Sequence, residues 1–130
     1  DLDHVEQTMK PVAKFGFRMA KEEDVPAAVQ LVRQNFGFEA AITDYQTIEV
    51  TKVGVTKASG LKHVCDHYGL KTENVIVFGD SGNDIPAMRI AGYAVAMGDA
   101  APDVKAAADE VTASIHDDGV VLAINRLFDL

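Results

Sequence analysis

Residues 75–84, which read VIVFGDSGND, decide the fold. Four consecutive apolar residues at 75–78 are typical of a parallel strand that is covered on both faces. The polar residues that follow, 79–84, contain two carboxylates and a carboxamide. In open parallel sheets ligands bind beyond the carboxyl ends of the strands, so this loop is the expected position of a binding site.

The composition of the loop favours a metal ion. Asp80 and Asp84 lie so close in the chain that they repel each other unless a cation or a proton compensates them. Their oxygens suit Mg²⁺, which commonly takes one or two carboxylates together with water and substrate phosphate. Gly79 and Gly82 are expected to let the backbone turn sharply and approach a ligand. Such a loop could also be an ordinary helix cap, but the apolar strand before it favours the metal site.

Length and composition indicate a globular domain. The chain has 130 residues, of which 48% are hydrophobic and 25% charged, with a formal net charge of −8. A chain this acidic repels nucleic-acid backbones and anionic membranes, so neither is an expected partner. No stretch approaches the roughly 18 apolar residues of a membrane span. The single cysteine, Cys65, excludes an internal disulfide and agrees with a reducing, cytoplasmic location.

The pattern of apolar residues changes near residue 52. Before it, alternation and helical spacing predict a strand, a helix and two strands, over residues 15–20, 21–35, 38–42 and 47–51. Gly37 is the expected end of the helix. Residues 1–52 are therefore interpreted as a small α+β unit.

After residue 52, helices and strands alternate. The predicted helices cover residues 58–68, 84–91, 101–109 and 118–128, and the predicted strands cover residues 75–78, 93–97 and 111–114. The inward face of the first helix is expected to carry Leu61, Val64, Cys65 and Tyr68. This alternation predicts an α/β fold, with a parallel sheet and helices on both of its faces.

Several motifs in this order resemble one family. Residues 77–84 (VFGDSGND) resemble the fourth motif of the haloacid dehalogenase (HAD) superfamily. Similarity to its Cof-type branch continues at residues 48–50 (IEV), 54–61 (GVTKASGL), 90–100 (IAGYAVAMGDA), 104–109 (VKAAAD) and 117–120 (DDGV). That branch consists of Mg²⁺-dependent phosphatases of sugar phosphates and related metabolites. The resemblance implies a Rossmann-like half-core over 53–130, a cap remnant over 1–52, and a small phosphorylated metabolite as substrate.

The resemblance also implies a set of site residues. They are catalytic Lys57, metal-binding Asp80 and Asp84, and phosphate-binding or site-ordering Gly79, Ser81 and Asn83. In the family, the carboxylate that corresponds to Asp80 binds Mg²⁺, and Asp84 supports the metal directly or through its other ligands. The lysine that corresponds to Lys57 neutralises the nucleophilic aspartate and the phosphoryl group. These roles agree with phosphoryl transfer, which depends mainly on positioning and charge neutralisation.

The family's nucleophile and general acid–base belong to a D-x-D-G-T/S motif that follows a buried strand. Residues 1–3 (DLD) match its first letters, but His4 and Val5 follow and no apolar strand precedes them. We therefore expect this match to be a coincidence in a surface segment. The chain is interpreted as the C-terminal half of a Cof-type protein, which alone should have no substantial phosphatase activity and should bind Mg²⁺ weakly.

Two other interpretations stay open at this stage. Residues 85–88 (IPAM) also resemble the run that follows the same motif in P-type transport ATPases, so the chain could be a piece of such a protein. It could instead be a non-catalytic module that binds a phosphate ligand or a protein.

His63 and His67 are interpreted as surface histidines, because no third metal ligand is suggested. Apolar surface left uncovered on a partial cap makes a homodimer plausible.

Overall fold

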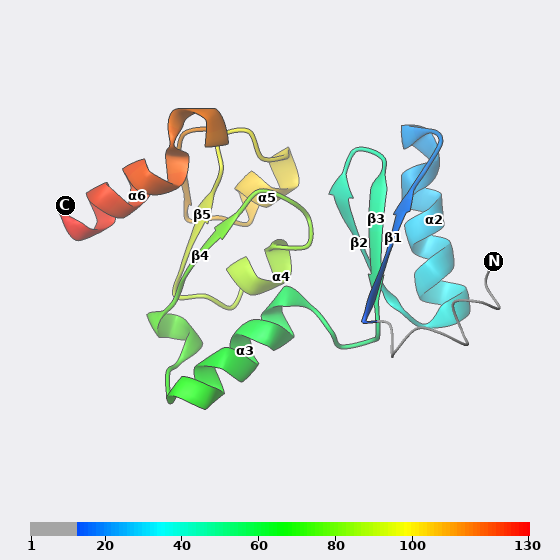
Figure 1. Cartoon of the computed structure of the whole chain (residues 1–130), viewed down its shortest axis with the longest axis horizontal. Helices are drawn as coiled ribbons and strands as arrows, with labels where there is room; N and C mark the ends of the chain where they lie inside the picture. The colour runs from blue at the N-terminus through cyan, green and yellow to red at the C-terminus, as the bar shows by residue number, and fades with distance from the viewer. Residues whose placement is uncertain (1–12) are drawn as a thin grey trace.

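The computed structural model describes residues 13–130. They form two three-stranded sheets, each accompanied by its own helices, and the two units lie next to each other (Figure 1). We call residues 13–51 the N-terminal unit and residues 57–130 the C-terminal unit. A short loop connects Thr51, the last residue of the first sheet, to Lys57, the first residue of a helix.

The N-terminal unit is an antiparallel sheet with one helix on its face. Its strands are β1 (Lys14–Arg18), β2 (Glu39–Asp44) and β3 (Thr47–Thr51), in the order β1-β3-β2. Helix α2 (Val25–Leu31) follows a 3₁₀ turn (Glu22–Asp24) and continues into a π-helical turn (Val32–Phe36). Gly37 ends this segment in the left-handed conformation, as the sequence predicted. Packing of α2 against β2 and β3 buries Val25, Ala40, Ile48 and Val50.

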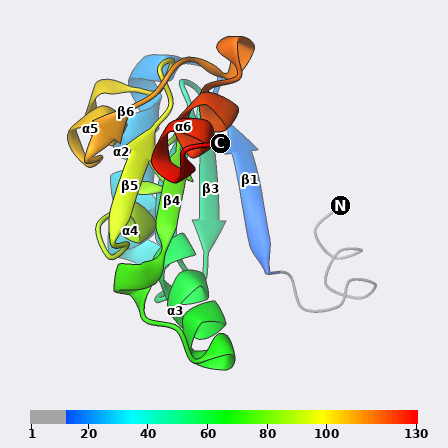
Figure 2. The same cartoon turned by 90° about the vertical axis from the view of Figure 1, so that its left-hand side faces the viewer.

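One edge of this sheet leaves two aromatic side chains half-exposed. Phe15 and Phe17 pair across strands with Val50 and Ile48, so they point to the same face as these core residues. Helix α2 packs on β2 and β3, whereas β1 lies at the opposite edge of the sheet (Figure 2). Phe15 and Phe17 are consequently 50% and 51% exposed. A homodimer formed through such apolar surface stays a prediction.

The C-terminal unit confirms the predicted α/β class. Its parallel sheet has the strand order β4-β5-β6. Its elements are α3 (Lys57–Tyr68), β4 (Ile76–Gly79), α4 (Ile85–Met88), β5 (Tyr93–Ala96), α5 (Pro102–Ala106), β6 (Glu110–Val111) and α6 (Gly119–Phe128), with 3₁₀ turns at Thr72–Asn74 and Ile115–Asp117. Its core is formed by Met88, Ala94, Ala96, Met97, Ala100 and Val104. No helix in the described part of the chain is long and apolar enough to cross a membrane.

Two predicted helices are too long by about one turn at their C-terminal ends. The structure ends α4 at Met88 rather than residue 91, because the N–H of Gly92 donates to the carbonyls of Thr72 and Val75 and ties the chain to the segment before β4. Likewise α5 ends at Ala106 rather than residue 109. There the N–H of Asp109 donates to the carbonyl of Ala94, and the Asp109 carboxylate accepts from the N–H of Ala94. Hydrogen bonds to β5 and to the segment before β4 therefore override helical composition.

Two burial predictions are wrong for the described residues. Strand β4 was expected to be covered on both faces, but Ile76, Val77 and Phe78 are only half-buried, and β4 pairs with β5 alone. On α3, Cys65 is buried as predicted, whereas Val64 and Tyr68 are 50% and 70% exposed. The helix packs against α4, and the strip of α3 that is buried there is narrower than the apolar face of its sequence.

Gly92 offers a test of the tight passage before β5. A Cβ atom at this position would lie 1.9 Å from the carbonyl oxygen of Glu73. We expect Gly92→Ala to lower the free energy of unfolding by about 3 kcal/mol, measured by urea denaturation. Gly60→Ala is the matched control, because Gly60 is inside α3 and a Cβ there meets no atom within 4 Å. It should raise stability by about 0.5–1 kcal/mol; equal effects of the two substitutions would contradict this prediction.

Candidate functional site

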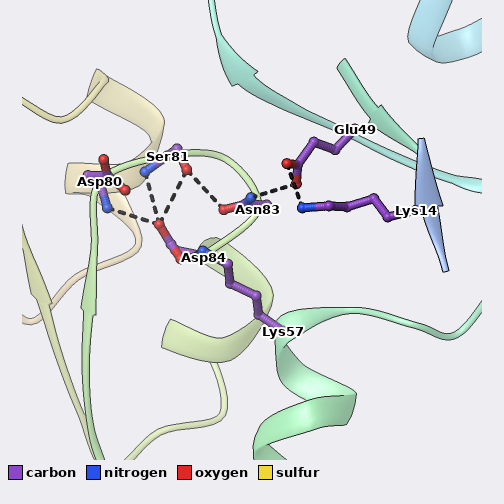
Figure 3. A network of polar contacts seen from close by, with 7 residues as sticks. All are labelled: Lys14, Glu49, Lys57, Asp80, Ser81, Asn83 and Asp84. Atoms are coloured by element: carbon purple, nitrogen blue, oxygen red, sulfur yellow. Dashed lines mark hydrogen bonds and ion pairs between the residues drawn. The ribbon is translucent and has the colours of Figure 1, made fainter. Parts of the chain in front are cut away.

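The predicted site loop folds around one buried carboxylate. The loop follows the carboxyl end of β4, and Asp84, which is 5% exposed, stands at the start of α4. Its Oδ2 accepts hydrogen bonds from the N–H groups of Asp80 (3.0 Å) and Ser81 (3.1 Å). Its Oδ1 accepts from the Nζ of Lys57 (Figure 3). The structure therefore brings together residues that are 27 positions apart in the sequence.

Lys57 reaches this carboxylate from the first position of α3. Thr56 caps the helix: its side chain accepts from the N–H of Ser59 (3.1 Å), and the Ser59 hydroxyl oxygen accepts from the N–H of Thr56 (2.9 Å). This reciprocal cap fixes the backbone from which the lysine extends. The side chain of Lys57 stays 51% exposed, so the ammonium group is able to contact a second anion.

The two aspartates of the loop have different electrostatic surroundings. Burial raises the pKa of the Asp84 carboxyl, but hydrogen bonds from Lys57 and from the N–H groups of Asp80 and Ser81 outweigh it, so the pKa lies below its ordinary value of 3.8. For Asp80, whose side chain is exposed, partial desolvation, a hydrogen bond with Asp84 and the charge of Asp84 raise the pKa, while the charge of Lys57 and a backbone hydrogen bond lower it only in part. Asp84 is thus an anion compensated by protein donors, whereas the charge of Asp80 is compensated less completely.

This difference fits a cation at Asp80. Asp80 lines a cavity of about 300 Å³ together with Lys57, Asp84 and Asp99. A positive ion in it would relieve the charge that raises the pKa of Asp80. Within residues 13–130, no three His, Cys, Asp or Glu side chains gather as metal ligands. Mg²⁺ requires only one or two carboxylates besides water and phosphate oxygens, so the donors present suit part of its ligand shell.

The loop glycines allow close packing. Neither Gly79 nor Gly82 has a positive φ, and Gly82 lies in the turn formed by residues 82–84. A Cβ on Gly79 would lie 2.5 Å from the Sδ of Met88 and 2.8 Å from the Cβ of Asp84. A Cβ on Gly82 would lie 2.9 Å from the carbonyl oxygen of Ile42. Gly82 is therefore one of the points where the loop contacts the N-terminal unit.

The sequence did not predict the partners of Asn83. Its Nδ2 donates to Oε2 of Glu49 (3.3 Å), and its Oδ1 accepts from the hydroxyl of Ser81 (2.9 Å) (Figure 3). The other oxygen of Glu49 accepts from the Nζ of Lys14 (2.7 Å). The hydrogen bond from Lys14, aided by Asn83 and by the charges of Lys14 and Lys57, lowers the pKa of Glu49 below its ordinary value despite partial burial. Alternation along β3 could have placed Glu49 on the face away from α2, but not against this loop.

A larger cavity of about 490 Å³ separates the two units beside the loop. Among the side chains that line it, the charged ones are Lys14, Arg33, Glu39, Glu49, Lys57 and Asp103. Cationic and anionic groups are both present, although the whole chain has a net charge of −8. A polar ligand could therefore find donors and acceptors in this cavity next to the site loop.

Comparison with known proteins defines the class. Residues 2–124 match the model of the haloacid dehalogenase-like hydrolase family, and the chain belongs to that family. It is 37% identical over 118 residues to the 5-amino-6-(5-phospho-D-ribitylamino)uracil phosphatase YitU of Bacillus subtilis (strain 168), covering 85% of this chain and 43% of that protein. It is also 34% identical over 123 residues to a phosphoglycolate phosphatase of Methanothermobacter thermautotrophicus, covering 89% of this chain and 55% of that protein.

The solved structures agree with this assignment. The HAD subclass IIB sugar phosphatase BT4131 superimposes with a TM-score of 0.78 at 36% identity, covering 91% of this chain and 44% of that chain. The predicted family and α/β fold are thus confirmed. The chain spans about half the length of these relatives, at 43%, 55% and 44%. The division at residues 52 and 53 and the roles of individual site residues stay predictions.

The environment of Asp84 predicts how stability depends on pH. Because its folded-state pKa is lowered, its stabilising contribution is complete above its unfolded value of 3.8 and is lost as the pH falls below it. In metal-free buffer at pH 7, Asp84→Asn should lower the free energy of unfolding by about 2–3 kcal/mol. Urea denaturation between pH 7 and pH 3 should show this difference shrinking below pH 4. Asp66→Asn, at an exposed position of α3, is the control; a difference independent of pH would contradict the prediction.

Proposed function

We propose that these residues form part of the active site of a Mg²⁺-dependent phosphatase. The reaction would hydrolyse a phosphate monoester of a small metabolite through an aspartyl-phosphate intermediate. One observation carries this proposal: the ammonium group of Lys57 donates to the buried carboxylate of Asp84, at the end of a parallel strand and beside Asp80, whose charge is compensated only in part. The names of the relatives, which are phosphatases of an aminouracil ribityl phosphate, of phosphoglycolate and of a sugar phosphate, support it.

Each residue has a role that follows from its contacts. Asp80 would hold Mg²⁺, which when bound supplies positive charge to the oxygens of the phosphoryl group. The exposed side of the Lys57 ammonium would neutralise the same group. Both oxygens of Asp84 already accept hydrogen bonds from protein donors, so we assign it the indirect role of positioning Lys57 and the loop. Ser81 and Asn83 would order the loop from its other side.

The nucleophile must come from another part of the protein. The 130 residues contain no D-x-D-G-T/S motif, and residues 1–3, whose match was interpreted as a coincidence, lie outside the described residues. Strand β4 pairs with β5 on one side only among the described residues, although its apolar sequence is typical of an internal strand. We propose that a strand carrying the nucleophile pairs with the other edge of β4, next to Asp80.

A cytoplasmic location is also proposed for the protein.

The proposed function predicts the behaviour of the 130-residue chain alone. Without a nucleophile it should show no substantial turnover of p-nitrophenyl phosphate in the presence of Mg²⁺. Turnover by the wild-type chain that disappears in Asp80→Ala would overturn the conclusion that the site is incomplete. The same inactivity would also be expected of a non-catalytic module, so a second assay is required.

The second assay joins these residues to an N-terminal half that carries the D-x-D-G-T/S motif. Hydrolysis of p-nitrophenyl phosphate should then require Mg²⁺ and stop in EDTA. Lys57→Ala should lower kcat by at least about 100-fold, because charge neutralisation in the transition state is lost. Lys62→Ala, on the exposed side of the same helix, should leave kcat unchanged. Absence of activity in a folded protein of this kind would favour the non-catalytic binding module.

A further inference from the structure

The site loop contacts the N-terminal unit through two adjacent residues. Gly82 lies against the carbonyl of Ile42 on β2, so closely that a Cβ atom would come within 2.9 Å of it. Asn83 donates to Glu49 on β3, at 3.3 Å. Ile42 pairs with Ile48, the neighbour of Glu49, so both contacts fall on the same part of the sheet. The loop is thus seated on β2 and β3.

Contacts within the N-terminal unit hold the side chain of Glu49. Its Oε1 accepts from Lys14 on β1, at 2.7 Å, and its side chain is only 27% exposed. Its neighbours Ile48 and Val50 are buried in the core of the N-terminal unit. The Oε2 atom that faces Asn83 therefore belongs to a carboxylate held by two strands.

The contact sets the orientation of the Asn83 amide. With Nδ2 directed to Glu49, Oδ1 is directed to the hydroxyl of Ser81, from which it accepts at 2.9 Å. The opposite orientation would place Oδ1 against the carboxylate of Glu49, which is repulsive. Ser81 in turn donates its N–H to Asp84, at 3.1 Å. Polar contacts therefore run from the N-terminal sheet to the carboxylate on which Lys57 also lies.

We propose that Glu49 is a positioning residue, which holds Asn83 in the orientation that orders the Asp80–Asp84 loop and makes this order depend on the seating of the N-terminal unit. The inference rests on the proposed function only in taking the loop as a Mg²⁺ site. The coupling between Glu49 and the loop is measured without turnover and therefore without the missing nucleophile.

Three variants of the 130-residue chain separate the contact from general effects. Glu49→Ala removes the acceptor, and Glu49→Gln keeps the shape and one acceptor oxygen. Asn83→Asp places a carboxylate opposite Glu49 and leaves the N-terminal unit unchanged. The control is Glu23→Ala, because Glu23 is an exposed carboxylate that pairs with Lys21 within the N-terminal unit.

The measurement is a Mg²⁺ titration followed by ¹H–¹⁵N NMR. Two signals are read: the side-chain NH₂ of Asn83 without metal, and the backbone amides of Asp80 and Ser81 during addition of MgCl₂. Glu49→Ala should shift the Asn83 NH₂ signals and weaken Mg²⁺ binding about fivefold, which is the effect of one lost hydrogen bond. Asn83→Asp should weaken binding at least as much. Glu49→Gln should retain part of the affinity lost in Glu49→Ala, because its one carbonyl oxygen can accept from Asn83 but then no longer from Lys14. Glu23→Ala should leave the affinity unchanged.

An unchanged Asn83 signal and an unchanged Mg²⁺ Kd in Glu49→Ala would overturn the proposal. So would an equal loss in Glu49→Ala and Glu49→Gln. The amides of Ile48 and Val50 report whether the N-terminal unit is folded, and if Glu49→Ala unfolds it, Glu49→Gln and Asn83→Asp decide the question. If Mg²⁺ does not shift the Asp80 amide even in the wild-type chain, the proposed metal role fails. The metal-free Asn83 signal then still tests the role of Glu49.

Discussion

The C-terminal unit depends on the hydrogen bonds that the buried carboxylate of Asp84 accepts. A buried charge destabilises a fold by several kcal/mol unless donors surround it. Here the donors come from separate segments, because Lys57 begins α3 while Asp80 and Ser81 follow β4. Satisfying one anion therefore fixes the start of a helix, the end of a strand and the loop between them at a single point. Removal of any donor would leave part of the charge uncompensated, so the geometry of the site and the stability of the fold share one cause.

The two aspartates of the loop differ in how far protein donors compensate their charge. Asp84 is compensated from within the protein, and its pKa is lowered, whereas the pKa of the exposed Asp80 is raised by partial desolvation and by Asp84. Carboxylates in different surroundings are suited to different roles, as in other sites that separate two titratable groups. The buried Asp84 orders the loop through its hydrogen bonds. Asp80 lines the cavity, where its negative charge is available to a ligand. In a chain with a net charge of −8, the proposed cation at Asp80 would give an anionic ligand a locally favourable position.

The sequence predicted the parts that rest on local pattern. Residues 75–84 combined an apolar strand with a polar loop, and the structure brings Asp80, Asp84 and Lys57 together as the family resemblance implied. The ends of α4 and α5 were not predictable in this way, because hydrogen bonds from Gly92 to the segment before β4 and from Asp109 to β5 decide them. The contact between Glu49 and Asn83 spans 34 positions and depends on how two units pack. Periodicity describes one element at a time, so it carries no information on such a contact.

The loop must satisfy partners on two sides, and this explains its residue types better than turn propensity does. At position 82 the carbonyl of Ile42 leaves no room for a Cβ atom, although the backbone has no positive φ there. At position 83 the side chain must donate to a carboxylate and accept from a hydroxyl at the same time. Asparagine meets both demands with one planar amide, whereas aspartate would repel Glu49 and serine would be too short to bridge the two partners. The pair Gly82 and Asn83 is therefore specified by the seating of one unit on the other as much as by any ligand.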